Sequence, residues 1–153
     1  MTAAAPAGKA RLYMSMSVDG FITGPDDGPE HGLGVDGFRL SNWLDKRDNP
    51  GASGDVYAEH LATRTLISGR RTYELAGHWG GDHHNGVPIF ALTHELPDEK
   101  PPGTVRYVTD VAEWAPQAHA AVGDGVAMVH GAGAAQALLH YHDPWSVAHT
   151  RRR

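Results

Sequence analysis

The 153-residue sequence contains no cysteine, no excess of positive charge and no long apolar run. The missing cysteine excludes disulfide bonds, thiolate catalysis and cysteine-ligated metal centres, and it fits a reducing cytoplasm. The formal net charge of −5 gives no electrostatic footprint for nucleic acid. No segment approaches membrane-spanning length, and residues 1–9 lack the apolar core of a signal peptide. We therefore expect a cytoplasmic protein that binds neither nucleic acid nor membrane.

Strand and helix patterns alternate along most of the chain. The expected strands cover residues 10–18, 63–68, 87–93, 105–109 and 126–129. The expected helices cover residues 38–44, 56–62, 70–74, 111–122 and 134–139. This alternation predicts an α/β three-layer sandwich, with a mostly parallel sheet between helices on both faces. We expect one domain over residues 10–139, a disordered N-terminus over 1–9 and an atypical tail over 140–153.

A glycine turn at residues 131–133 joins the last predicted strand to the last predicted helix. Such a turn lets a phosphate approach the backbone, where the first N–H groups of the helix are unpaired. The turn fits the opening of a Rossmann fingerprint, but Gln136 occupies the third glycine position and the chain ends about where the acidic residue should follow. A turn that only lets strand and helix pack explains the same residues equally well.

A second glycine turn, at Gly69, opens the predicted helix that begins with Arg70, Arg71 and Thr72. Cations at a helix N-terminus oppose the helix dipole, which costs up to about 1 kcal/mol unless an anion joins them. A bound phosphate would reverse this penalty through charge-assisted hydrogen bonds. Solvated arginines, or arginines paired with acids such as Glu74, are the equally weighted alternative.

Asp19-Gly20 interrupts the first apolar segment, which resumes at Phe21 and Ile22. The break indicates either a strand interrupted beside a site or an ordinary hairpin turn, and the turn is favoured. The following loop, residues 24–37, is rich in glycine and is of the kind that covers active sites. Trp43, on the helix after it, is expected to be a core residue, with a stacking wall of the substrate pocket as the alternative.

The eleven histidines raise the question of a metal site, chiefly through His83-His84 and the pair at positions 140 and 142. Neither pair has the spacing of two helical ligands with an acid between them. We interpret them as scattered surface histidines and predict no metal site.

Four segments in chain order resemble the dihydrofolate reductase-like superfamily, and most closely its branch with the C-terminal reductase domain of bacterial riboflavin biosynthesis. They cover residues 17–22, 69–74, 90–93 and 129–136. The resemblance implies an NADPH-dependent oxidoreductase that delivers hydride to a small heterocycle, either a dihydrofolate-like pterin or an aminopyrimidine of the riboflavin pathway. The arginines agree with NADPH as the cofactor, because NAD sites use an acid there.

The same resemblance implies which residues bind the cofactor. The turn at Gly69, Arg70, Arg71 and Thr72 would hold its phosphates, with the two arginines as candidates for the adenosine 2′-phosphate. The remaining expected contacts are Thr93 and His94 beside the adenosine, Gly131, Ala132, Gly133 and Ala134 along the pyrophosphate and nicotinamide, and Ile22 and Thr23 bordering the nicotinamide. Asp19, the acid at the interrupted strand, is the candidate for orienting substrate or relaying a proton, and so for the catalytic residue.

The tail departs from this family, in which further strands follow the glycine-turn helix and often form a dimer. Only 153 − 139 = 14 residues remain here, and they predict at most one short strand near residues 145–148. We therefore expect the C-terminal strands to be missing or altered by truncation. A bare sheet edge would then weaken the site or produce a rearranged homodimer. A catalytically weak nucleotide-binding remnant, or a self-associating protein, is the alternative to an active reductase.

Overall fold

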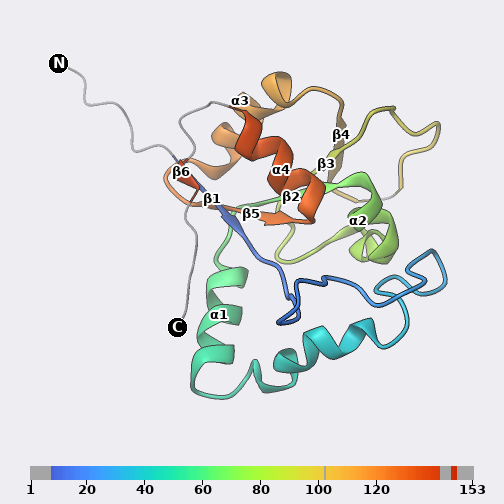
Figure 1. The fold of residues 1–153 in the computed structure, drawn as a ribbon. Coiled ribbons are helices and arrows are strands. Elements are labelled where there is room, and N and C mark those ends of the chain that lie inside the picture. Colours follow the sequence, from blue (N-terminus) through green and yellow to red (C-terminus); the bar gives the residue numbers. More distant parts are fainter. Residues whose placement is uncertain (1–7, 102, 142–145, 148–153) are drawn as a thin grey trace.

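A six-stranded, all-parallel sheet forms the centre of the molecule (Figure 1). The structure is a computed structural model that describes residues 8–101, 103–141 and 146–147. The strand order is β4-β3-β2-β5-β1-β6. The strands are β1 (Lys9–Leu12), β2 (Thr65–Gly69), β3 (Ile89–Leu92), β4 (Val105–Val108), β5 (Val126–His130) and β6 (Ser146–Val147). The predicted α/β class is confirmed.

Helices cover both faces of this sheet (Figure 1). On one face, α3 (Val111–Val122) and α4 (Ala132–His140) bury Trp114 and Leu138 against strand residues such as Ile67. On the other face, Tyr73 of α2 (Arg70–Leu75) and Trp79 of the 3-10 helix η2 (Gly77–Gly81) pack over Leu66 and its neighbours. The central strands are therefore buried on both sides, which explains their continuous apolar sequence.

Helix α3 continues through Pro116 without a restart. Its first turn is capped by Asp110, whose side chain accepts a hydrogen bond of 2.8 Å from the backbone N–H of Ala112. Four buried residues, Trp114, Ala115, Ala118 and Val122, hold one side of the helix on the sheet. Packing and capping thus offset the loss of the backbone hydrogen bond that Pro116 cannot donate.

The prediction of a strand over residues 10–18 was wrong beyond Leu12, where β1 ends. The alternating apolar side chains that suggested it do not share a buried face, since Met16 is 64% and Val18 110% exposed. Residues 17–21 instead form a closed turn. Ser17 accepts a hydrogen bond from the backbone N–H of Phe21 and donates one of 2.6 Å to Asp19. The Asp-Gly break is therefore a turn within a loop rather than within a strand.

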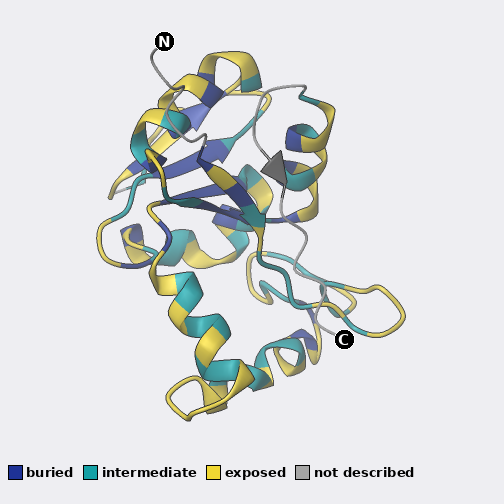
Figure 2. Ribbon diagram, turned by 90° about the vertical axis from the view of Figure 1, so that its left-hand side faces the viewer, coloured by how far each residue is buried: buried dark blue, intermediate teal, exposed yellow. Residues whose placement is uncertain are grey.

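Two elements at the periphery are lightly packed: the 3-10 helix η1 (Gly37–Lys46) and α1 (Ala52–Leu61) (Figure 2). α1 buries none of its residues, and η1 buries only Gly37. Trp43 of η1, expected in the core, is half-buried and donates a hydrogen bond of 2.9 Å from its indole N–H to Ser15. Neither element therefore adds a buried side chain to the central core.

Both segments predicted to flank the domain, residues 1–9 and 140–153, contribute residues to the sheet. β1 begins at Lys9, one residue before the predicted start of the domain. In the predicted tail, Ser146 and Val147 pair with Lys9 and Ala10 as β6, which confirms one short strand there.

No helix among the described residues is long and apolar enough to cross a membrane.

Candidate functional site

The two predicted glycine turns lie side by side at the carboxyl ends of β2 and β5. These strands are neighbours, with Ser68 paired to His130, so the residues that follow them emerge together. A Cβ atom on Gly131 would lie 2.5 Å from the hydroxyl oxygen of Thr72, and one on Gly69 would lie 4.0 Å from the backbone nitrogen of Ala134. Residues 69–72 and 131–134 therefore form one continuous rim, at the edge where ligands bind in open α/β sheets.

The N-terminus of α4 is open toward solvent. Gly131 has φ of 92°, no side-chain hydrogen bond caps the helix, and Ala132 and Gly133 are exposed. A Cβ atom on Gly133 would meet nothing within 4 Å. The backbone N–H of Gly131 itself points to the sulfur of Met14 at 3.2 Å. The first turn of this helix thus presents N–H groups beside free space, an arrangement suited to an anion.

The side chains of Arg70 and Arg71 reach different segments of the chain, and each is paired with an acid. The Nε of Arg70 donates to Glu74 at 2.6 Å, and its Nη1 donates to the carbonyl of Glu95 at 3.2 Å. Arg71 donates to the carboxylate of Asp27 at 2.7 Å. The alternative of acid-paired arginines therefore describes the protein without a ligand. Arg70 reaches toward the segment after β3, whereas Arg71 reaches the loop at residues 24–37.

The other expected cofactor contacts occupy separate places. Thr93 and His94 follow β3, two strands from β5, and the Thr93 hydroxyl donates to the carbonyl of Glu95 at 2.6 Å. Ile22 and Thr23 are half-buried in the loop after the Ser17 turn, and Asp19 is exposed within that turn. The strand ends bring Gly69, Thr72, Gly131 and Ala134 together, whereas no described contact joins Asp19 or Ile22 to them.

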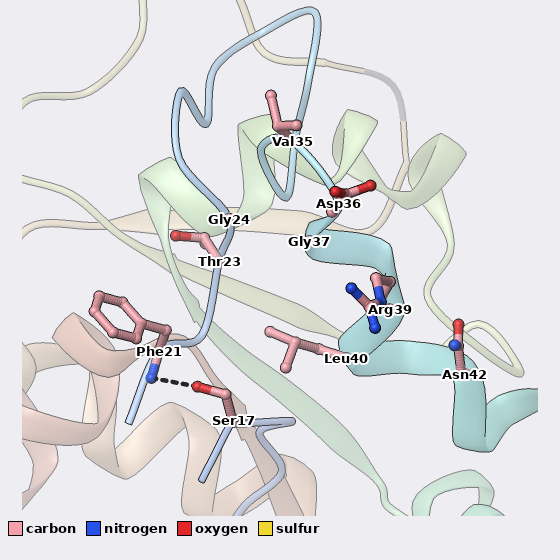
Figure 3. A pocket seen from close by; sticks show the side chains of 10 residues that line it. All are labelled: Ser17, Phe21, Thr23, Gly24, Val35, Asp36, Gly37, Arg39, Leu40 and Asn42. Carbon is pink, nitrogen blue, oxygen red and sulfur yellow. Dashed lines mark hydrogen bonds between the residues drawn. The ribbon is translucent and has the colours of Figure 1, made fainter. Parts of the chain in front are cut away.

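An open cavity of about 430 Å³ lies between the Ser17 turn and η1 (Figure 3). Its lining includes Thr23, Arg39 and Leu40, and Figure 3 shows Phe21 and Leu40 on opposite sides of it. The loop at residues 24–37 and η1 both contribute to its wall, while Trp43 does not line it. The polar side chains of Arg39 and Asn42 in this wall carry no motif that sequence reasoning could have used.

A cluster of histidine rings is the feature that the sequence interpretation missed. His60 of α1 stacks on His83 with a centroid distance of 5.0 Å, and His84 and His130 lie next to His83 at 5.0 Å and 5.4 Å. His84 is 7% exposed, so the interpretation of His83-His84 as surface histidines was wrong. The four residues are far apart in the sequence or adjacent in a loop, and no helical spacing reveals them.

Burial favours the uncharged form of three rings in this cluster, those of His60, His83 and His130. It lowers the pKa of His60 to about 4, with a further contribution from His84. It lowers the pKa of His83 to about 3 and that of His130 to about 4, and repulsion between the rings adds to both effects. Each of these three rings therefore keeps one nitrogen lone pair at pH 7.

No family model and no curated protein sequence matches this chain. Among solved structures, it is similar to a putative riboflavin biosynthesis protein from Shewanella sp. PV-4, with a TM-score of 0.51 and 18% identity over 86% of this chain and 69% of that chain. The chain thus shares the overall α/β fold of that riboflavin biosynthesis protein. A dihydrofolate reductase from Enterococcus faecalis, complexed with NADP(H) and RAB-propyl, matches with a TM-score of 0.48 and 17% identity over 82% of this chain. The matched part spans 60% of that reductase. The similarity in fold to a riboflavin biosynthesis protein agrees with the resemblance found in the sequence.

Proposed function

We propose that the protein is an NADPH-dependent reductase that transfers hydride to a small heterocycle. The observation that carries the proposal is the continuous rim formed by residues 69–72 and 131–134. An extended dinucleotide has anionic groups along its length and needs backbone N–H groups, small residues and a hydroxyl in one groove. The rim offers all three.

The pyrophosphate would lie against the first turn of α4. Ala132, Gly133 and Ala134 can supply N–H groups, and Thr72 can supply a hydroxyl from the adjoining turn. Gly133 leaves the close approach open, because nothing occupies the space where its side chain would be. We propose that the arginines bind the 2′-phosphate by exchanging a carboxylate partner for a phosphate, Arg71 leaving Asp27 or Arg70 leaving Glu74.

The substrate side of the proposal rests on the cavity beside η1. NADPH supplies the hydride when bound, and the chain supplies orientation and exclusion of water. A cavity of about 430 Å³ has the size of a site for a small molecule, and Arg39 and Asn42 in its wall suit the polar edge of a pterin or aminopyrimidine. Ser17 holds the Asp19 carboxylate at the turn that lines this cavity, where it can orient substrate.

Fluorescence titration with NADPH and NADH tests the proposal. We expect saturable binding that favours NADPH, and a loss of this preference in Arg70→Ala or Arg71→Ala. Arg64→Ala is the matched control. Arg64 forms a similar surface ion pair with Asp124, but it lies at the amino end of β2, whereas Arg70 and Arg71 follow the carboxyl end. No binding at millimolar NADPH would refute the proposal.

Turnover separates the reductase from its alternatives. Oxidation of NADPH with dihydrofolate or with the riboflavin-pathway aminopyrimidine is expected of an active enzyme. Binding without turnover on either substrate identifies a nucleotide-binding remnant. Concentration-dependent self-association without nucleotide affinity, measured by light scattering, identifies an assembly protein.

A further inference from the structure

Three histidines from two distant segments converge on one point. His60 comes from α1, whereas His83 and His84 come from the segment between η2 and β3. Each residue offers one ring nitrogen, and these nitrogens all lie within 4.8 Å of one another. The group contains no carboxylate. Such a nitrogen-only set is unsuited to magnesium or calcium, which prefer oxygen ligands.

The hydrogen bonds around His84 fix its tautomer. Its Nε2 faces the carbonyl oxygen of Thr63 at 3.2 Å and the hydroxyl oxygen of Thr63 at 3.1 Å. That hydroxyl already donates its proton to the carbonyl of His60 at 2.7 Å, so it can only accept from His84. The Nε2 atom therefore carries the proton, and in the neutral ring Nδ1 has a free lone pair.

That lone pair points to His83. The two Nδ1 atoms lie 2.7 Å apart, so without a metal His83 donates a hydrogen bond to His84. A protonated ring nitrogen bound to a carbonyl, with the other nitrogen aimed at a cluster of lone pairs, is the arrangement by which proteins orient histidine ligands of metal ions.

We propose that His60, His83 and His84 form a binding site for a divalent transition-metal ion, with Zn²⁺ as the best fit. Neutral imidazoles are zinc ligands, and three of them leave a fourth tetrahedral position for water or a small ligand. None of the three ligands belongs to the proposed cofactor rim, and the existence of the metal site does not depend on the reductase activity.

Binding requires only a small rearrangement. Tetrahedral zinc, with bonds of about 2.0–2.1 Å, places ligand nitrogens about 3.4 Å apart. The hydrogen bond between His83 and His84 must therefore break, because a zinc-bound nitrogen carries no proton: His83 binds either through Nε2 or through Nδ1 after its proton moves to Nε2. The widest separation in the group must also close. His84 is buried and held by Thr63, whereas His60 and His83 are half-buried and can rotate. The ion would tie α1, which buries no residue of its own, to the segment that leads into β3.

Calorimetric titration of the metal-free, untagged full chain with ZnCl₂ tests the proposal. We expect one ion per chain, a rise in Tm with zinc, and a visible Co²⁺ absorption of tetrahedral type. His60→Gln and His83→Gln should each weaken zinc binding at least about tenfold, and Thr63→Val, which removes the hydroxyl that orients His84, should weaken it by about tenfold. His31→Ala, which removes an exposed histidine outside the cluster, is the matched control and should bind as the wild type does.

The variants keep the proposal falsifiable even if one of them misfolds. His60 lies on a helix without buried residues, so His60→Gln should retain the far-ultraviolet circular dichroism of the wild type. Absence of zinc binding by the folded wild type would overturn the proposal. So would wild-type zinc affinity in both folded His60→Gln and His83→Gln, because the ion would then bind other histidines.

Discussion

The hydroxyl group of Thr72 lies directly against the backbone of Gly131, although the two residues are 59 positions apart (131 − 72 = 59). The contact exists because β2 and β5 are neighbours and both chains turn at the same edge of the sheet. It joins the two glycine turns into one wall. The proposed cofactor site depends on this proximity.

Gly131→Ala should destabilise the fold by about 1–3 kcal/mol. The residue has φ of 92°, and the added methyl group would lie 2.5 Å from the Thr72 hydroxyl oxygen. Chemical denaturation measures the loss. Thr72→Ala in the same background should recover only part of it, since the contact is relieved but the backbone strain remains. Wild-type stability in Gly131→Ala would show that the turn is looser than described.

Gly133→Ala should separate folding from binding. The position lies in the first turn of α4 with open space around it, so alanine should raise the free energy of unfolding by about 0.4–1 kcal/mol. The same methyl group would occupy the space assigned to the pyrophosphate and should lower NADPH affinity. Denaturation and fluorescence titration give the two values. An unchanged affinity would remove Gly133 from the proposed site.

Asp27→Asn should increase NADPH affinity without changing NADH affinity. Asp27 holds Arg71 at 2.7 Å, and loss of its charge frees the guanidinium for the 2′-phosphate. Arg71→Ala should have the opposite effect, a loss of about tenfold to a hundredfold for NADPH alone, because a charge-assisted hydrogen bond contributes about 1.5–3 kcal/mol. If both variants keep the wild-type ratio of NADPH to NADH affinity, Arg71 is not a phosphate ligand.

Stability of the metal-free protein should fall as the pH is lowered below about 6.5. Burial holds the pKa of His130 at about 4 in the folded state, whereas an unfolded histidine titrates near 6.5. The unfolded chain therefore binds more protons below pH 6.5, and the stabilisation present above that pH is lost as the pH falls toward 4. His130 alone should account for about 1–2 kcal/mol between pH 6.5 and 5. His60 and His83, whose pKa values burial also lowers, should add to this loss.

Denaturation in the presence of a chelator, between pH 7.5 and 5, measures this loss above the range where most carboxyl groups protonate. His31→Ala should follow the wild-type pH profile, because its ring lies outside the cluster. A flat profile would mean that the histidines become charged without cost and are better solvated than their burial indicates.

Most of the sheet and the two glycine turns were predictable because they depend on local patterns. Continuous apolar runs such as residues 87–93 indicate strands buried on two faces, and the glycine turns indicate where strands pass into helices. The β1 prediction extended too far because Met14, Met16 and Val18 alternate without a sheet partner to cover them. Apolar alternation alone does not distinguish a strand from an exposed loop.

The partners of charged and titratable side chains were less predictable. The sequence allowed Glu74 as a partner of Arg70, four residues away on the same helix, but gave no sign that Asp27 would pair with Arg71. The histidine cluster depends on α1 meeting the segment before β3, a tertiary contact with no sequence spacing. Contacts of this kind follow from topology, which a single sequence determines only indirectly.

A titration of the ¹⁵N-labelled protein with NADP⁺, followed by amide chemical shifts, tests the proposed site most directly. We predict that the largest shifts occur together at the amides of residues 69–72 and 131–134, with one dissociation constant for both segments. Shifts confined to one segment, shifts located elsewhere, or no shifts at millimolar NADP⁺ would contradict a single dinucleotide site across the two strand ends.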